Sequence, residues 1–203
     1  MNHQVDNSHY NFNKYNTISR WDSYYYQIKE ILNLNLKNVL EIGPGANILK
    51  SVLPIYGIKY YSCDIASDLN PDYLQDVREL KINKKFDVVC AFQVLEHLPF
   101  EFFEQSLCSM KDHSNKYVLI SLPRCGAKFR FSFKLPNIQQ FSFSFKFPRI
   151  KKFEFNGEHY WEIDAPETRK IDVEKIIKKH FTILKEYIIP ENAYHQIYIL
   201  KKK

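Results

Sequence analysis

Two adjacent acid–base side chains, Glu96 and His97, follow a long apolar run in the sequence. A histidine titrates near neutral pH, so His97 with Glu96 beside it could take a proton from a hydroxyl group. The alternative is that the pair caps or orients the helix that follows. We interpret Glu96 and His97 as candidate catalytic residues.

A third candidate, His159, lies in the run Phe-Asn-Gly-Glu-His-Tyr-Trp-Glu. His159 and Glu158 could hydrogen-bond hydroxyl groups, while Tyr160 and Trp161 could stack on a ring. Aromatic side chains before a helix also pack in cores, and both interpretations stay open. We predict an acceptor pocket around His159.

A turn with two glycines, Glu41-Ile42-Gly43-Pro44-Gly45, follows a short apolar run. Glycine has no Cβ, so the backbone can turn sharply and a ligand can lie against it. By itself the pattern is also compatible with a simple tight turn.

Two aspartates follow at distances that suit a nucleoside. Asp64 lies about twenty residues beyond Gly43, at the expected end of a strand, where a carboxylate can accept from both ribose hydroxyls. Its alternative role is to cap the next segment. Asp76 could accept from the exocyclic amine of an adenine or serve as a turn residue.

Hydrophobic periodicity indicates the elements that must position these residues. Helices are expected at 21–34, 46–55, 100–110 and 172–180, and strands at 38–42, 59–63, 73–77, 86–92, 116–122, 182–189 and 194–200. Continuous apolar strands alternating with helices are typical of a parallel sheet covered on both faces. We therefore predict an α/β fold, a Rossmann-like, doubly wound and mostly parallel seven-stranded sheet with an antiparallel C-terminal hairpin.

The order Glu41, Gly43, Gly45, Asp64, Asp76 and then Phe86-Asp-Val-Val-Cys-Ala-Phe-Gln-Val-Leu-Glu-His97 resembles the class I S-adenosylmethionine-dependent methyltransferase family, over roughly residues 37–123. The resemblance implies S-adenosyl-L-methionine as the cofactor. It places the glycine turn on the methionine part, Asp64 on the ribose and Asp76 on the adenine. The implied cofactor contacts are Glu41, Gly43, Gly45, Asp64, Ile65, Asp76, Val77 and Gln93.

Two other kinds of site are disfavoured. Asn47 stands where a third glycine would help to cradle the pyrophosphate of a nicotinamide cofactor. Quinone-biosynthetic O-methyltransferases and small-RNA 2′-O-methyltransferases bind a divalent metal with a Glu-x-x-Glu-His cluster. Here the first position is Gln93, a weaker ligand, so we predict that no metal is required.

The 203 residues suit a single domain, 1–203, with an N-terminal arm and helix (1–35) and a basic aromatic insertion (123–165). Between Pro123 and Phe153 there are eight Lys or Arg and eight Phe but no Asp or Glu. The insertion could be a lid over an anionic small molecule, grip single-stranded nucleic acid, or attach to an acidic membrane surface. It could also be a solvated face with its Phe side chains in the core.

Composition excludes some classes of protein and leaves three functions open. No apolar run approaches the roughly 18 residues of a membrane span, and four dispersed cysteines indicate reduced thiols in a cytoplasmic protein. The first hypothesis is O-methylation of a small hydroxylated acceptor, which could be anionic, such as a sugar or sugar-nucleotide. The alternatives are an RNA methyltransferase and a non-catalytic S-adenosylmethionine-binding module. The oligomeric state stays open.

Overall fold

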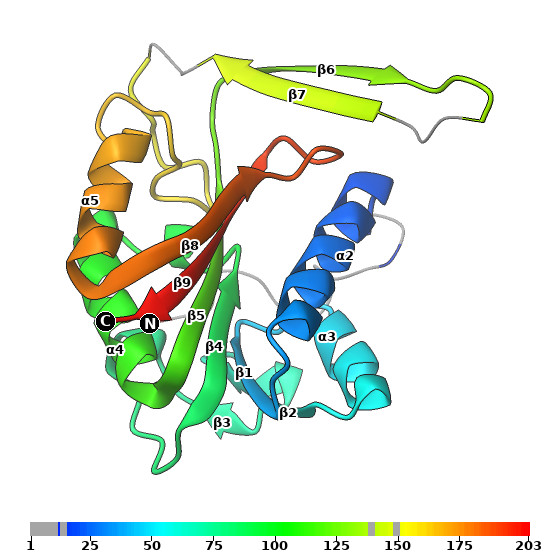
Figure 1. Ribbon diagram of the computed structural model, residues 1–203. Helices are drawn as coiled ribbons and strands as arrows, with labels where there is room; N and C mark the ends of the chain where they lie inside the picture. The colour runs from blue at the N-terminus through cyan, green and yellow to red at the C-terminus, as the bar shows by residue number, and fades with distance from the viewer. Residues whose placement is uncertain (1–11, 13–15, 138–140, 148–150) are drawn as a thin grey trace.

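The computed structural model describes residues 12, 16–137, 141–147 and 151–203 (Figure 1). The helices are α2 (Ile18–Asn33), α3 (Ile48–Val52), α4 (Phe103–His113) and α5 (Lys170–His180). The strands are β1 (Asn38–Ile42), β2 (Lys59–Asp64), β3 (Tyr73–Leu74), β4 (Phe86–Phe92), β5 (Ser114–Pro123), β6 (Ala127–Phe133), β7 (Phe141–Phe147), β8 (Phe181–Ile188) and β9 (His195–Lys202).

Seven of these strands form one sheet in the order β3-β2-β1-β4-β5-β9-β8. Strands β1 to β5 pair in parallel, whereas β9 is antiparallel to both β5 and β8. The predicted mostly parallel α/β sheet with an antiparallel C-terminal hairpin is therefore confirmed. Because the chain runs outward from β1 to β3 and then returns to β4, the carboxyl ends of β1 and β4 flank the point where strand order reverses. Ligands of open α/β sheets bind at such a point.

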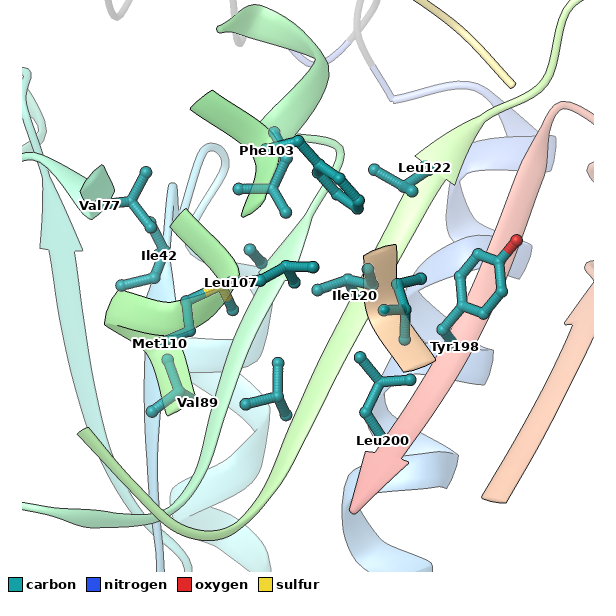
Figure 2. Close-up of a cluster of buried hydrophobic side chains, with 14 of the residues drawn as sticks. Ile42, Val77, Val89, Phe103, Leu107, Met110, Ile120, Leu122, Tyr198 and Leu200 are labelled. Atoms are coloured by element: carbon teal, nitrogen blue, oxygen red, sulfur yellow. The ribbon is translucent and has the colours of Figure 1, made fainter. Parts of the chain in front are cut away.

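Each face of the sheet has its own hydrophobic core. Alternation along β1 sends Leu40 and Ile42 to one core and Val39 to the other. Figure 2 shows the first core, where Phe103, Leu107 and Met110 of α4 pack on the strands. Helices α4 and α5 cover this face, and α2 and α3 cover the opposite one (Figure 1).

The structure corrects several predicted boundaries. The third strand is only Tyr73–Leu74, because the chain enters a short 3₁₀ helix at Val77–Glu79. The helix expected at 46–55 is divided into α3 and a 3₁₀ helix, Leu53–Tyr56, which has a proline in its first turn. Proline has no N–H to continue the α-helical hydrogen bonds. Of the predicted N-terminal arm, residues 1–11 and 13–15 lie outside the described part of the chain.

The basic aromatic insertion contains a hairpin that the sequence analysis did not predict. Strands β6 and β7 pair antiparallel and form a second, two-stranded sheet (Figure 1). The alternative that its Phe side chains turn into the core is wrong for the hairpin. Six of them are between 46% and 65% exposed: Phe129, Phe131, Phe133, Phe141, Phe143 and Phe147.

Two further observations concern the cysteines and the character of the helices. All four cysteines are free, and Cys63 and Cys90 are buried in β2 and β4 as predicted. Among the described residues, no helix has the length and apolar character needed to cross a membrane.

Candidate active site

The glycine turn after β1 adopts backbone angles that favour glycine. Gly43 has φ 67° and Gly45 has φ 49°, both in the left-handed region. A Cβ on Gly43 would lie 2.5 Å from Cγ2 of Val94, so the turn packs directly on the segment that leads to Glu96. Asn47, in place of a third glycine, also takes a left-handed φ of 57°, which asparagine tolerates.

Glu41, the last acidic residue before the turn, is buried on the opposite side of β1 from Leu40 and Ile42. The Tyr60 hydroxyl donates to its Oε2 at 2.5 Å. Burial raises the pKa of Glu41 to about 8, and the nearby Asp64 charge adds to the rise, although the Tyr60 hydrogen bond opposes it. Its carboxyl group is thus protonated at neutral pH and hydrogen-bonded inside the fold, behind the glycine turn.

The protonated state of Glu41 predicts a dependence of stability on pH. The native state holds a proton that the unfolded chain loses above pH 4.5, so the free energy of unfolding should fall as pH rises toward 8. The expected slope for one such group is about 1.4 kcal/mol per pH unit. In Glu41→Gln this contribution to the slope should disappear, and the variant should gain relative stability at pH 9. Urea denaturation from pH 5 to pH 9 measures the slope.

Glu101→Gln is the matched control, because Glu101 is exposed on a 3₁₀ helix. It should keep the slope of the unchanged protein. The same slope in Glu41→Gln and in the unchanged protein would contradict a protonated Glu41.

Asp64 ends β2 at the same edge of the sheet as the glycine turn. Its Oδ1 accepts a hydrogen bond from the Ala66 N–H at 2.8 Å, which closes a turn. The N-cap of the following 3₁₀ helix, Ser67–Leu69, is Ala66, so the capping role considered for Asp64 is wrong. A carboxylate has further lone pairs, and the side chain is only partly buried, so this bond leaves capacity for a ligand hydroxyl. Ile65 beside it is 41% exposed and presents an apolar surface at this edge.

Asp76 caps the 3₁₀ helix that follows β3 and forms an ion pair with Arg78 at 2.5 Å. Burial opposes ionisation, but the hydrogen bonds and charge of Arg78 outweigh it and hold the pKa of Asp76 below its ordinary value. Asp76 is therefore a charged acceptor already shared with Arg78. Val77 is buried in the main core, so only its backbone is available for the predicted cofactor contact.

Gln93 follows β4 with a φ of 59°, a conformation that non-glycine residues adopt rarely. Its amide nitrogen donates to the Ser121 hydroxyl at 3.1 Å, and its backbone N–H donates to the Ser121 carbonyl. These bonds tie the ends of β4 and β5 together. Strained backbone of this kind clusters at functional sites.

Glu96 lies in the 3₁₀ helix after β4 and is completely buried. Within the described part of the chain, neither oxygen of its carboxyl group has a hydrogen-bond partner. Burial raises the pKa of Glu96 to about 7, although the charge of His159 lowers it. A buried polar group without a partner is costly, and such groups often mark a site that acts on a ligand.

His97 does not cap the next helix. Its Nδ1 lies 3.0 Å from the Glu158 carbonyl oxygen. Because a carbonyl can only accept, Nδ1 carries the proton in the neutral ring, and Nε2 keeps its lone pair.

His159 meets this pair from a distant part of the sequence. The two imidazole rings of His97 and His159 lie edge to face, with centroids 4.9 Å apart. Nδ1 of His159 lies 3.0 Å from Oε1 of Glu162, which also accepts from the Tyr194 hydroxyl. Burial favours the neutral ring, but the Glu162 hydrogen bond and the charges of Glu96, Glu162 and Glu158 raise the pKa of His159 above its ordinary value.

Glu96, His97 and His159 thus form one cluster, hereafter the Glu-His-His cluster. Each offers one donor atom, and these atoms lie within 4.8 Å of one another. The set can accept and pass on a proton, and one carboxylate with two imidazoles is also a donor set that divalent transition metals accept.

The two aromatic side chains predicted to line an acceptor pocket around His159 differ in exposure. Trp161 is 2% exposed, donates to the Leu98 carbonyl at 3.0 Å and packs against Phe100 and Phe103. The proposed stacking role of Trp161 is therefore wrong, because its ring belongs to the core. Tyr160 is 39% exposed and can still contact a ligand.

Sequence reasoning missed several residues that support the cluster. Glu162 lies three positions after His159, and this helix-like spacing was the only available signal. Tyr194 carried no signal, because it reaches the cluster from the β8–β9 connection. Nearby, Arg124 forms an ion pair with Asp164 at 2.6 Å and donates to Gln196, joining the end of β5 to β9 and to the segment before α5.

Comparison with known proteins gives one family and a set of structural neighbours. Residues 14–167 match the family model described as methyltransferase domain. A search of curated protein sequences found no significant match.

The structural neighbours share the fold at low sequence identity. An S-adenosylmethionine-dependent methyltransferase from Clostridium acetobutylicum ATCC 824 has a TM-score of 0.58 at 12% identity, covering 92% of each chain. The glycopeptide N-methyltransferase MtfA has a TM-score of 0.59 at 14% identity, covering 87% of this chain and 95% of its own. The magnesium protoporphyrin IX methyltransferase of Synechocystis PCC 6803, solved with S-adenosylhomocysteine bound, has a TM-score of 0.57 at 15% identity, covering 91% and 83%.

The family match extends over more than half of the 203 residues. It includes the glycine turn, Asp64, Asp76 and the Glu-His-His cluster. The sheet order and the antiparallel final hairpin agree with it. The chain therefore belongs to the class I S-adenosylmethionine-dependent methyltransferases.

Proposed function

We propose that this methyltransferase methylates a hydroxyl oxygen of a small acceptor, such as a sugar or sugar-nucleotide. The observation that supports this choice most directly is the Glu-His-His cluster, with its buried and unpartnered carboxyl group, beyond the carboxyl end of β4. A hydroxyl acceptor must lose a proton during methylation, and the cluster is equipped to receive one.

The residues along the carboxyl edge fit the cofactor. The glycine turn after β1 would lie against its methionine part, the Asp64 carboxylate would accept from the ribose hydroxyls, and Asp76 would accept from the adenine amine while keeping Arg78. Ile65 offers an apolar surface for the adenine ring, and Glu41 holds the strand beneath the turn. When bound, S-adenosylmethionine supplies an electrophilic methyl group on a sulfonium sulfur, so no covalent enzyme intermediate is needed.

The proton path follows from the hydrogen bonds of the histidines. The Glu158 carbonyl fixes the His97 tautomer, so Nε2 would take the proton of an acceptor hydroxyl. The resulting imidazolium of His97 is stabilised by Glu96, while Glu162 orients His159 beside them.

The insertion 123–165 is suited to act as a lid within a single domain spanning 1–203. The Lys146 ammonium of β7 donates to the Arg124 carbonyl and lies 5.6 Å from the centre of the Tyr194 ring. Tyr194 in turn bonds Glu162 of the site. A movement of the hairpin is thereby linked to the groups that orient His159.

The four free cysteines support a reducing compartment, and we propose that the protein is cytoplasmic.

Transfer of a labelled methyl group from S-adenosylmethionine to a panel of hydroxylated acceptors tests the function. We expect label on the oxygen of a sugar or sugar-nucleotide, with a rate that rises as pH passes through the titration of the cluster. RNA serves as the competing acceptor. Label on RNA alone, with binding that falls steeply as salt is added, would show an RNA methyltransferase instead.

The same assay tests for a metal. Because Gln93 occupies the position of the first glutamate of the Glu-x-x-Glu-His cluster and is bonded to Ser121, we expect activity to survive treatment with a chelator. Activity that is lost with the chelator and restored by magnesium or a transition metal would make the Glu-His-His cluster a metal site.

A further inference from the structure

The β6–β7 hairpin places its phenylalanines on one face. Phe129 pairs with Phe145, Phe131 with Phe143, and Phe133 with Phe141, while Phe147 pairs with Ala127. Neighbouring residues of a strand point to opposite faces, so residues at these alternate positions share a face. We call this surface the Phe face; it consists of Phe129, Phe131, Phe133, Phe141, Phe143, Phe145 and Phe147.

Lys146 shows which way the Phe face points. Its ammonium donates to the Arg124 carbonyl and lies over the Tyr194 ring, so this side chain is directed to the body of the protein. Phe145 and Phe147 flank Lys146 in β7 and therefore lie on the far side of the ribbon. The exposed fractions of six Phe residues, between 46% and 65%, agree with a surface turned outward.

The rings on the Phe face pack against one another. Phe145 stacks on Phe129 and Phe131 with ring centroids 5.4 Å and 6.3 Å apart, and Phe147 meets Phe145 edge to face at 5.7 Å. The result is a continuous apolar surface. An isolated two-stranded hairpin is marginal in water, and an exposed patch of this kind marks an interaction site.

The charge of the segment narrows the choice of partner. Eight Lys or Arg and no acidic residue lie between Pro123 and Phe153. Lys134, Lys151 and Lys152 are exposed near the ends of the hairpin. An apolar face with exposed cations near its ends matches a partner with an apolar interior and an anionic surface.

We propose that the β6–β7 hairpin docks the protein on the surface of an anionic lipid bilayer, with the Phe face in the interface and the surrounding cations at the lipid headgroups. This inference goes beyond the methylation reaction and does not depend on it. No part of the chain needs to span the membrane.

Two other partners fit the geometry less well. Single-stranded nucleic acid stacks its bases on separated rings and needs cations beside the same face. Here the rings pack on one another as one apolar surface, and the exposed lysines lie near the ends of the hairpin rather than among the rings. A second copy of the chain that paired its Phe face with this one would cover the apolar surface but would bring the exposed lysines of the two copies together.

Vesicle sedimentation with the full chain tests the proposal. The probes are vesicles of pure phosphatidylcholine and vesicles of equal parts phosphatidylcholine and phosphatidylglycerol. We expect binding to the anionic vesicles to be at least about tenfold tighter and to weaken as salt is added. The variant Phe131→Ser/Phe133→Ser/Phe143→Ser should lose binding by about tenfold or more.

Four further variants make the result specific. Leucine at the same three positions should restore binding to lipid, because leucine keeps the apolar surface. Lys134→Gln/Lys151→Gln/Lys152→Gln should lose the preference for anionic lipid while the Phe face is untouched. The matched controls are Ile18→Ser/Ile55→Ser/Ile171→Ser and Lys50→Gln/Lys59→Gln/Lys81→Gln, which change exposed residues of the same kinds elsewhere and should bind like the unchanged protein.

Three results would overturn the proposal. The first is failure of the unchanged protein to bind anionic vesicles, or binding of the serine variant to these vesicles that equals that of the unchanged protein. The second is binding of a single-stranded oligonucleotide that serine abolishes and leucine does not restore, which would assign the hairpin to nucleic acid. The third is a dimer in light scattering that the serine variant converts to a monomer, which would assign the Phe face to a second copy.

Discussion

Replacing His97 by glutamine is expected to lower kcat by about 10²–10⁴-fold, the usual contribution of a positioned general base. The amide can still donate to the Glu158 carbonyl, but it has no basic nitrogen to accept a proton. Affinity for S-adenosylmethionine and the unfolding midpoint should change little, because the change is confined to the proton acceptor. Initial rates with saturating substrates and calorimetric titration with the cofactor separate these quantities.

His113→Gln is the matched control. His113 is also partly buried, but it accepts from the Ile82 N–H and contacts the Ser109 carbonyl on α4, away from the cluster. It should retain kcat. If His97→Gln keeps more than a third of the activity, another group removes the proton.

Replacing Asp64 by alanine is expected to weaken S-adenosylmethionine binding by more than about tenfold, because hydrogen bonds to a charged group contribute about 1.5–3 kcal/mol each. Asp64→Asn should lose less affinity. The asparagine oxygen can still accept from the Ala66 N–H, and its NH₂ group can donate to a hydroxyl oxygen, so this variant removes the charge and keeps the turn. Calorimetry with S-adenosylmethionine and S-adenosylhomocysteine measures both losses.

The control for Asp64 is Glu79→Gln, which removes an exposed carboxylate beyond β3. Its cofactor affinity should equal that of the unchanged protein. Equal and small effects of Asp64→Ala and Glu79→Gln would mean that the ribose is held elsewhere.

The unchanged protein should also gain about 2.7 kcal/mol in its free energy of unfolding at a cofactor concentration one hundred times Kd, which a non-binding fold would not show.

The sheet could be predicted because its signals are local. Strands such as Phe86–Phe92 are apolar on both faces, and this pattern identifies a buried parallel strand from its own residues. Boundaries that depend on hydrogen bonds of individual side chains were less accurate. The third strand is two residues long because Asp76 begins a 3₁₀ helix and accepts from the Arg78 backbone, a contact that periodicity does not report.

The candidate site could be predicted only in part, because its residues come from segments that are far apart in the sequence. Glu96 and His97 are neighbours in the sequence and follow a clear strand. Their contact with His159 depends on the Tyr160 N–H bonding the Glu96 carbonyl and on His97 bonding Glu158, across more than sixty residues of chain. Tyr194 enters the site from yet another segment, so no spacing rule pointed to it.

By itself, the sequence determined the parallel sheet with its antiparallel end, the glycine turn, Asp64 at the end of β2 and Asp76 shortly after β3, because each is encoded in a few consecutive residues. Only the tertiary structure decided that Trp161 packs in the core, that Glu41 is buried against Tyr60, and that the phenylalanines of the insertion point outward. These outcomes depend on which distant surfaces pack together, and burial and charge act through space rather than along the chain.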